Sequence, residues 1–374
     1  MKDLALGVSF LCIFFTWRLE LLQAGQNQQD LEFSLSACPW TEAQMLFHGD
    51  PHWLGGDGAS SVDLDMKRVL WLFGDSFVNE GDSRSRYNAV LVRNSIAVQS
   101  GRDPAKARMR FFWNKRKGKP TAYFQEEGDE WFWPGSGAPL KRALIIIFLM
   151  KIRESRGGLG FEPSGWKAVL IADTGKDASM WHIKYLSCPP TQRILVGSSS
   201  TLILDSFLYA FCTDWKDNFV YLVRWPLGDA CRGDLSHLQW WMGTNGWMEG
   251  KPLEPKPVPV FTGGQVEFTV HYEPRIKRFL QIQTFSLNDP CLSMRFSQDL
   301  TGPWTLPICF FQPPEKRLPG LLIYAGKAHK VFNGADLAFT YSVNTMDKKK
   351  ILKEKVIYYP VVLKGKVSMK RRGP

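Results

Sequence analysis

Two aspartates near the start of the chain have the residue type and spacing for acid–base chemistry. Asp57 and Asp75 are each flanked by glycine, which lets a bulky ligand approach the backbone. If residues 65–68 form a turn between two antiparallel strands, Asp57 lies opposite Ser76 and beside Asp75. The spacing therefore predicts two carboxylates at one end of a hairpin, within side-chain reach of a common point.

Paired carboxylates suit the hydrolysis of glycosidic bonds. One protonates the leaving oxygen, while the other activates water or attacks the anomeric carbon. Two acids held close together also have different pKa values, which separates the acid from the base. The alternative is that Asp next to Gly forms ordinary turns at the hairpin ends. The local pattern leaves both interpretations open.

Five other side chains are candidates for the same site, each with a structural alternative. Glu267 follows two glycines and could be a third carboxylate or an exposed strand residue. Lys327 and His329 could bind sugar hydroxyls or a carboxylate, although a lone histidine is often hydrogen-bonded structure. Arg295 could pair with an acid of the site or form a plain salt bridge. Trp133 could stack on a sugar or fill the core.

The elements that must position these residues are short strands separated by Gly, Pro and Asp. The expected strands are residues 69–73, 144–150, 168–172, 202–212, 219–225, 266–272, 279–285, 321–325 and 337–342. Neither a long amphipathic helix nor an alternation of strands and helices is present in the sequence pattern, which disfavours a parallel α/β fold. Aromatic residues make up 13% of the 374 residues and favour sheets. The sequence predicts an all-β, five-bladed β-propeller, because radial repetition hides strand edges that one long sheet would expose.

A series of short motifs, most of them containing glycine or aromatic residues, is distributed along the chain: Trp53–Val62 with Val69–Phe77, Arg93–Val98, Trp131–Gly135, Trp240–Gly243, Gly264–Val270, Leu300–Trp304, Tyr324–His329 and Thr340–Thr345. Together they resemble a family of secreted five-bladed propellers that includes endo-D-arabinanases. The resemblance covers most of residues 38–362 and implies that Asp57 and Asp75 are catalytic. It also adds Asn94 to the substrate-binding candidates. The chain departs from the family where His329 is followed by Lys330, a lysine where relatives tend to have proline.

The ends of the chain predict an exported protein. Residues 1–24 resemble a signal peptide, with a cationic start, an apolar run and a small residue, Ala24, at its end. Six cysteines follow it, an even number that fits disulfides. The propeller is expected at 31–363 and a basic tail at 364–374. Ten Lys or Arg and two acids in 345–374 give that stretch +8 of the net +11.

Other function classes lack their motifs. The sequence has no Gly-x-Ser-x-Gly, His-Glu-x-x-His, phosphate loop or dinucleotide fingerprint. We expect no cofactor and no bound metal, although a propeller channel could hold calcium. The expected partner is a polysaccharide, not nucleic acid or a membrane span, and the expected state is a monomer. Two alternatives remain open, a non-catalytic glycan-binding propeller and a cell-surface adhesion protein.

Overall fold

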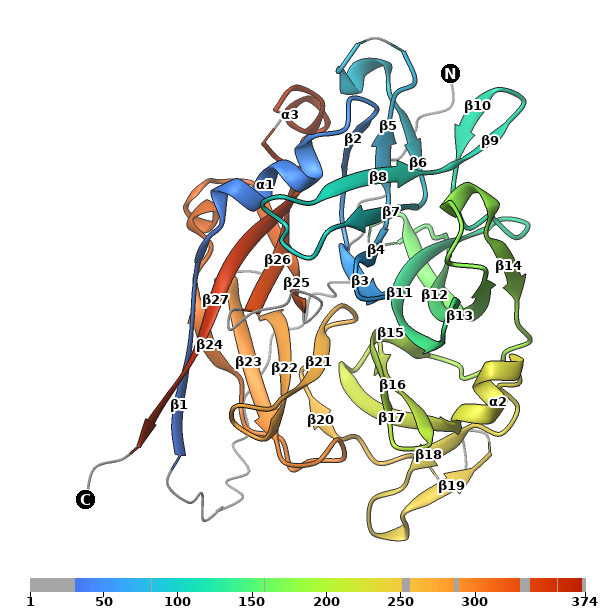
Figure 1. The fold of residues 1–374 in the computed structure, drawn as a ribbon, viewed down its shortest axis with the longest axis vertical. Coiled ribbons are helices and arrows are strands. Elements are labelled where there is room, and N and C mark those ends of the chain that lie inside the picture. The colour runs from blue at the N-terminus through green and yellow to red at the C-terminus, as the bar shows by residue number, and fades with distance from the viewer. Residues whose placement is uncertain are drawn as a thin grey trace.

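The protein is built almost entirely of antiparallel sheets arranged around a common centre (Figure 1). The computed structural model describes residues 31–81, 83–157, 159–250, 256–285, 289–329, 337–354 and 356–371. Its helices are short: α1 (Thr41–His48), α2 (Leu227–Arg232), α3 (Lys348–Lys353) and the 3-10 turns η1 (Arg86–Asn88), η2 (Ala178–Met180), η3 (Gly243–Asn245) and η4 (Pro314–Arg317). Within the described ranges, none of the helices has the length and hydropathy needed to span a bilayer.

Five of the described sheets have four or more strands. The first contains β3 (Ser60–Asp63), β4 (Arg68–Phe73), β7 (Ser95–Ser100) and β8 (Arg108–Phe112). The second contains β11 (Glu130–Lys141), β12 (Leu144–Glu154), β13 (Phe161–Ala172) and β14 (His182–Tyr185). The third contains β15 (Ile194–Leu204), β16 (Phe207–Asp214), β17 (Phe219–Pro226), β18 (Gln239–Trp241) and β19 (Trp247–Glu249), with β20 (Phe261–Thr262) paired to β17.

The last two of these sheets complete the circle. The fourth contains β21 (Thr269–Glu273), β22 (Arg278–Phe285), β23 (Cys291–Ser297) and β24 (Ile308–Phe311). The fifth contains β25 (Leu321–His329), β26 (Leu337–Thr345), β27 (Pro360–Arg371) and β1 (Leu31–Pro39). Two smaller sheets extend the first: β2 (Trp53–Gly56), β5 (Ser76–Val78) and β6 (Val90–Val92), and the hairpin of β9 (Asn114–Arg116) and β10 (Lys119–Thr121).

The innermost strands of the five sheets are linked to one another by hydrogen bonds. The five links are Ser60 Oγ to Gly135 O (2.7 Å), Ser136 Oγ to Gly197 O (2.6 Å), Val270 N to Ser200 Oγ (2.9 Å), Ala328 N to Thr269 Oγ1 (2.9 Å) and Ser61 Oγ to His329 Nδ1 (2.8 Å). They connect β3, β11, β15, β21 and β25 in chain order and return to β3. Small hydroxyl side chains therefore bind the centre of the molecule together where bulky residues would not fit.

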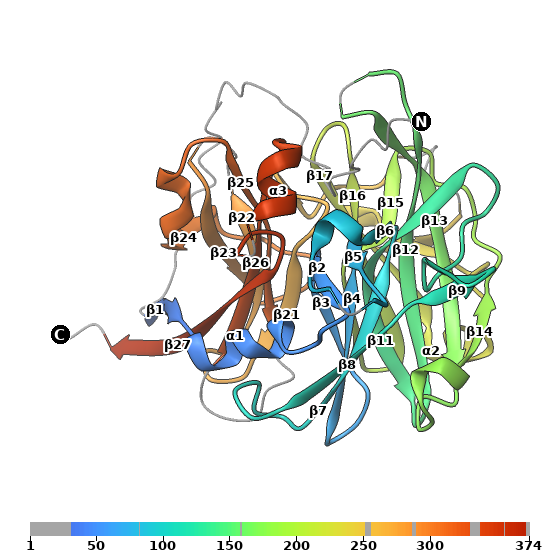
Figure 2. The same cartoon turned by 90° about the horizontal axis from the view of Figure 1, so that it is seen from above.

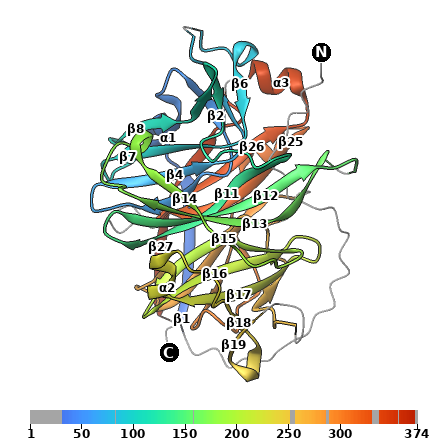
Figure 3. The ribbon, with the colours of Figure 1, turned by 90° about the vertical axis from the view of Figure 1, so that its right-hand side faces the viewer.

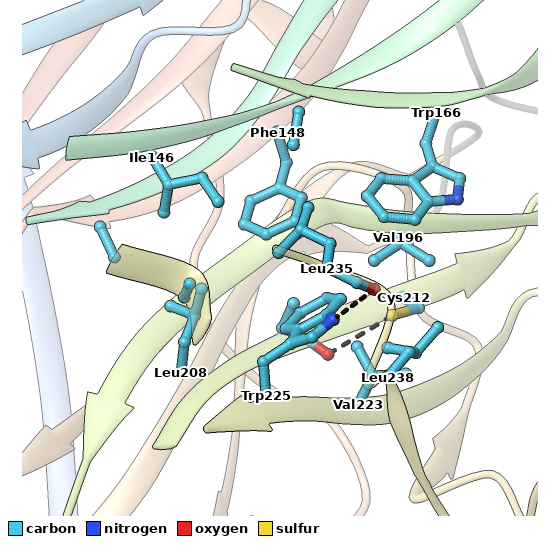
Figure 4. Close-up of a cluster of buried hydrophobic side chains, with 14 of the residues drawn as sticks. Ile146, Phe148, Trp166, Val196, Leu208, Cys212, Val223, Trp225, Leu235 and Leu238 are labelled. Carbon is cyan, nitrogen blue, oxygen red and sulfur yellow. Dashed lines mark hydrogen bonds between the residues drawn. The ribbon is translucent and has the colours of Figure 1, made fainter. Parts of the chain in front are cut away.

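Separate hydrophobic clusters fill the spaces between neighbouring sheets, which lie stacked face to face in Figure 3. Between the second and third sheets, Phe148 lies 5.7 Å from Trp225 and 6.0 Å from Trp166, measured between ring centroids (Figure 4). The indole N–H of Trp225 donates to the carbonyl of Leu235 at 3.1 Å. The high aromatic content thus serves mainly to fill the gaps between sheets, because large flat rings bury much area there.

The first and last strands of the described chain pair with each other. β1 and β27 run antiparallel from Leu31 opposite Arg371 to Pro39 opposite Leu363, and they lie side by side in Figure 2. The predicted boundary before a basic tail at 364–374 is therefore wrong, because the strand continues through Arg371 and its backbone is paired throughout. The predicted signal peptide at 1–24 lies outside the described residues.

The six cysteines in the described part of the chain form no disulfide. Cys38, Cys188, Cys212, Cys231, Cys291 and Cys309 all have free thiols. A disulfide in this chain stays a prediction.

Candidate active site

The hairpin formed by β3 and β4 carries the two aspartates, in a register one residue away from the predicted one. Ser60 pairs with Leu72 and Asp63 with Val69. Continuing this register places Asp57 opposite Asp75, and the amide of Gly74 donates to the carbonyl of Asp57 at 2.9 Å.

The turn of the hairpin explains the difference. Leu64 N and Asp65 N both donate to Arg68 O, at 3.2 and 3.4 Å, so the loop is not the symmetric four-residue turn that was expected. The Asp65 carboxylate accepts from the amides of Lys67 and Arg68 at 2.8 and 2.9 Å and fixes this shape. Ser76 consequently pairs with Gly56 rather than facing Asp57.

The backbone beside Asp57 needs glycine. Gly58 has φ +86°, in the left-handed region that side chains disfavour. A Cβ on Gly58 would lie 3.4 Å from Gly74 N and 3.5 Å from Glu267 Oε1. The close approach of these backbone segments brings Glu267, from the stretch before β21, next to the aspartate hairpin.

Asp75 is held as a hydrogen-bond acceptor on both carboxylate oxygens. Trp133 Nε1 donates to its Oδ1 at 2.8 Å, and Arg93 NH1 lies 3.3 Å from its Oδ2. The guanidinium of Arg93 in turn lies over the Trp131 ring, 4.2 Å from its centroid. Burial raises the pKa of Asp75 to about 7, although the charge of Arg93 and the Trp133 hydrogen bond pull it down.

Asp57 has a different pattern of partners. Tyr324 Oη donates to its Oδ2 at 2.6 Å, whereas its Oδ1 is buried and has no hydrogen-bond partner among the residues that the structure describes. Burial raises the pKa of Asp57 well above its usual value, and the negative charges of Asp75 and Glu267 raise it further. Burial and the two neighbouring carboxylates therefore favour the neutral form of Asp57.

The direction of the Tyr324 hydrogen bond follows from its neighbours. Thr345 N donates to Asn344 Oδ1 at 2.7 Å, which orients the amide so that its Nδ2 donates to Tyr324 Oη at 3.1 Å. An amide nitrogen cannot accept, so the tyrosine proton is left to point at Asp57. Burial also raises the pKa of Tyr324, which keeps that proton in place.

Glu267 and Lys327 form an ion pair next to Asp57. Lys327 Nζ lies 2.8 Å from Glu267 Oε1 and also donates to the carbonyl of Gly58. Lys327 is 1% exposed and Glu267 9%. The positive charge of Lys327 lowers the pKa of Asp57 and so opposes the two carboxylates around it. The structure thus brings together Asp57, Asp75, Glu267, Trp133 and Lys327, five of the residues that the sequence analysis named.

The other three predicted site residues use their polar atoms in the scaffold. His329 is hydrogen-bonded to Ser61 and Thr340, at 2.8 and 2.7 Å, and burial lowers its pKa to about 3, so it is neutral. Asn94 donates to two backbone carbonyls and accepts one amide. Arg295 donates to the carbonyls of Thr262 and Thr305. These contacts hold loops and sheets rather than the aspartates.

Four residues contact the aspartates or, in the case of Asn344, the tyrosine that is bonded to Asp57, without having been predicted as site residues. They are Arg93, Tyr324, Asn344 and Tyr358, the last of which donates from its hydroxyl to the carbonyl of Asp75 at 3.0 Å. The first three lie inside the motifs that carry the family resemblance, so their place in those motifs was the available signal. The described residues hold no group of three or more His, Cys, Asp and Glu side chains arranged to bind a metal ion.

Comparisons with known proteins match the chain to one family and to several structures. A family model described as "Domain of unknown function (DUF5005)" matches residues 41–358. None of the curated proteins compared with the sequence matches it. A crystal structure from Bacteroides ovatus, provisionally described as a hydrolase, has a TM-score of 0.70 at 16% identity, covering 92% of this chain and 97% of that one. At this identity the likeness shows a shared fold.

Two further structures are more distant. The catalytic domain of the GH62 α-L-arabinofuranosidase of Coprinopsis cinerea has a TM-score of 0.47 at 11% identity, covering 90% of this chain and 97% of that one. The exo-β-1,3-galactanase of Phanerochaete chrysosporium has a TM-score of 0.46 at 10% identity, covering 84% of this chain and 60% of that one.

Proposed function

The chain belongs to the DUF5005 family, and we propose that it is a secreted glycoside hydrolase that cleaves a furanosidic, arabinan-like polysaccharide. Asp57 and Asp75 act as its catalytic pair on a five-bladed propeller. The choice of substrate rests on the sequence resemblance to endo-D-arabinanases, and export rests on the signal-like residues 1–24.

The propeller assignment is supported by the ring of innermost strands. The described part of the chain forms five sheets of four or more strands. Five hydrogen bonds connect the innermost strands of these sheets in a closed circuit. In this architecture the segments that precede or form the innermost strands converge at the centre. Asp57, Glu267 and Lys327 all come from such segments, which explains how residues so distant in sequence meet.

The observation that carries the proposal is the unequal hydrogen bonding of the two aspartates. Asp75 accepts on both oxygens, so its carboxylate form is the one its partners stabilise. Asp57 accepts from Tyr324 on Oδ2, so when it is neutral its proton sits on the unpartnered Oδ1. Two acids with opposite protonation at one point are the requirement for glycoside hydrolysis.

These states assign a role to each aspartate. Asp57 Oδ1 gives its proton to the glycosidic oxygen as the bond from that oxygen to the anomeric carbon breaks. Asp75 either takes a proton from water, whose oxygen bonds to the anomeric carbon, or bonds to that carbon itself and is released by water in a second step. The anomeric form of the first product distinguishes the two routes. In both routes, the charges of Lys327 and Glu267 influence the pKa of Asp57.

One observation favours a second candidate, a propeller that binds a glycan without cutting it. Asp57 and Asp75 are both 0% exposed, so a sugar reaches them only if neighbouring groups move. A protein that merely recognises a glycan at the surface above them would not need that movement. The experiment below separates the two functions.

The test is release of reducing sugar from a panel of glycans, arabinans included, by the wild type and by Asp57→Asn and Asp75→Asn. General acid–base catalysis contributes roughly 10²- to 10⁴-fold to a rate, so we expect each variant to lose activity by a factor in that range. Asp65→Asn, on the same hairpin but at its turn, is the matched control and should keep full activity. Binding of a glycan by the wild type without any release would replace the hydrolase by the glycan-binding candidate.

A further inference from the structure

A hollow at the outer edge of the molecule is lined mainly by aromatic and apolar side chains. Its volume is about 120 Å³, and its lining residues are Phe112, Trp113, Asn114, Tyr123, Ala178, Ser179, Trp181 and Ile183. They belong to β8, the start of β9, the 3-10 turn η2, β14 and the loops beside these elements. Strands β8 and β14 are the outer strands of the first and second sheets, whereas the aspartates come from the inner side of the first sheet. The hollow is therefore separate from the proposed active site.

The aromatic walls of the hollow are fixed before any ligand binds. Trp181 Nε1 donates to Lys176 O at 3.0 Å, and Tyr123 Oη donates to Ala178 O at 2.8 Å. Trp113 Nε1 donates to Glu80 Oε1 at 3.1 Å. A ligand that stacks against rings already held in place loses little additional conformational entropy from the protein. The volume corresponds to about four water molecules, so the hollow admits part of one ligand unit rather than a whole chain.

The sequence around the hollow is strongly basic. Residues 102–119 contain eight Lys or Arg and one acid. Four of the eight have acidic partners: Arg102 with Asp63 (2.8 Å), Lys106 with Asp103 (3.6 Å), Arg110 with Asp177 (2.5 Å) and Lys115 with Glu80 (2.8 Å). These four carboxylates are therefore already paired with cations.

The other four cations are in excess. Arg108, Arg116, Lys117 and Lys119 are exposed, and the described part of the chain supplies none of them with an ion-pair partner. Arg108 is on β8, and the other three are on the β9–β10 hairpin, which projects at the periphery in Figure 1. We name these four residues the basic rim. Residues 112–114, which line the hollow, lie in the sequence between Arg108 and the other three residues of the basic rim.

One further cation belongs to the strand of the opposite wall. Ile183 lines the hollow, and the next residue on β14, Lys184, is exposed, with its side chain on the other face of the strand. Arg110 lies over the ring of Phe112, 5.0 Å from its centroid, at the edge of the hollow. The cations of the basic rim therefore flank residues 112–114 on one wall of a small aromatic recess. Their positive electrostatic potential attracts a polymer with repeated negative charges.

We propose that the hollow and the basic rim form a second binding site, for an acidic polysaccharide that carries carboxylate or sulfate groups. One sugar unit contacts the aromatic walls, and the negative groups of the neighbouring units pair with the basic rim. Aromatic faces suit the apolar side of a sugar ring, whereas a nucleic acid would need several exposed platforms in a row. The site holds the protein on a charged matrix, and this role goes beyond the proposed hydrolase.

The test measures the dissociation constants of the full chain for polygalacturonate, dextran sulfate, neutral dextran and single-stranded DNA. Replacing three rim residues together, Arg116→Ser, Lys117→Ser and Lys119→Ser, should weaken binding to an acidic glycan by at least about 10-fold. The matched control removes the same charge elsewhere, with Lys256→Ser, Lys353→Ser and Lys366→Ser, and should change the affinity by less than about 2-fold. All six positions are exposed, so both triple variants should fold.

A second variant separates the hollow from simple charge attraction. Trp113→Leu keeps every charge and should weaken acidic-glycan binding by about 5-fold or more. An unchanged affinity in this variant, or an equal loss in both triple variants, would reduce the site to diffuse electrostatics and overturn the proposal. Tighter binding of single-stranded DNA than of both acidic glycans would also overturn it. Because none of these residues contacts the aspartates, hydrolysis of a short neutral oligosaccharide should be the same in all variants, which keeps this test independent of the proposed function.

Discussion

The two ends of the β3–β4 hairpin show how the same residue type acquires opposite properties. At the turn, Asp65 is 41% exposed in its side chain and lies 2.6 Å from the guanidinium of Arg68. Partial burial alone would raise its pKa, but the amide of Lys67 and the guanidinium and amide of Arg68 outweigh it and lower the pKa. At the open end, burial dominates and raises the pKa values of Asp57 and Asp75.

The contrast teaches that position in the fold, not the local sequence, sets the proton state. All three aspartates belong to one hairpin of about twenty residues. Asp65 finds its partners within three residues, so its charge is compensated locally. Asp57 and Asp75 depend on Tyr324 and Trp133, which come from other sheets. The folded chain therefore stabilises an anion at one end and a proton at the other.

Among the substitutions that test this comparison, Tyr324→Phe is expected to have the largest effect, which is on the pH dependence and the rate of hydrolysis. The Tyr324 hydrogen bond lowers the pKa of Asp57, so its removal should raise that pKa and shift the alkaline limb of the pH–rate profile to higher pH. We expect kcat to fall by about 10-fold, because Oδ1 and Oδ2 are no longer distinguished. Tyr341→Phe, which removes a buried hydroxyl bonded to Glu315 at 2.9 Å, is the control. An alkaline limb that stays in place would show that Tyr324 has only a structural role.

An intermediate effect is expected on stability from Asp57→Asn. The folded pKa of Asp57 is raised above the usual value of 3.8, so the stability it contributes is complete below pH 3.8 and is lost as pH rises through the folded value. An amide keeps an acceptor for Tyr324 and cannot ionise. The variant should therefore be more stable than the wild type by about 0.5–2 kcal/mol at pH 8, with no gain at pH 4. Thermal unfolding at the two pH values measures this, and a gain of equal size at both would contradict it.

The smallest effect is expected at the other end of the hairpin, from Asp65→Asn. The folded pKa of Asp65 is lowered, so its contribution is present above pH 3.8 and is lost as pH falls through the folded value. The pair is exposed, and we expect a loss of about 0.2–1 kcal/mol at neutral pH that shrinks towards pH 2. Urea unfolding at pH 7 and pH 2 gives the difference. Equal losses at both pH values would mean that charge is not what Asp65 contributes.

Local patterns in the sequence predicted most of the expected strands and the proximity of the two aspartates. The expected strand 202–212 is wrong, because Asp205 and Ser206 form the turn between β15 and β16. Residues 144–150 form an unbroken apolar run, and they are buried at the centre of the second sheet. The glycines around Asp57 predict room for a ligand, and the structure adds that Gly58 has a positive φ. The hairpin register was wrong by one residue, because the hydrogen bonds of Asp65 reshape a turn that residue types alone make look symmetric.

The partners of the aspartates could not be predicted from local patterns. Tyr324 is 267 residues from Asp57 in the chain, and only the circular arrangement of sheets brings them together. Asn94 and Arg295 have side chains suited to ligands, yet both are satisfied by backbone carbonyls. Residue type gives the capacity for a hydrogen bond, but the fold decides whether the partner is a loop or a ligand.

The pairing of β1 with β27 has a consequence for how the protein is made. The fifth sheet takes its outermost strand from Leu31–Pro39 and the strand beside it from Pro360–Arg371. This sheet cannot be completed until residues 360–371 have been synthesised, and its closure brings together residues more than 320 positions apart. A stop codon before Pro360 would remove β27 and, with it, the partner of β1 and of one edge of β26. Connecting residue 371 to residue 31 through a short loop, and opening the chain between two sheets, would instead put both strands in one continuous hairpin.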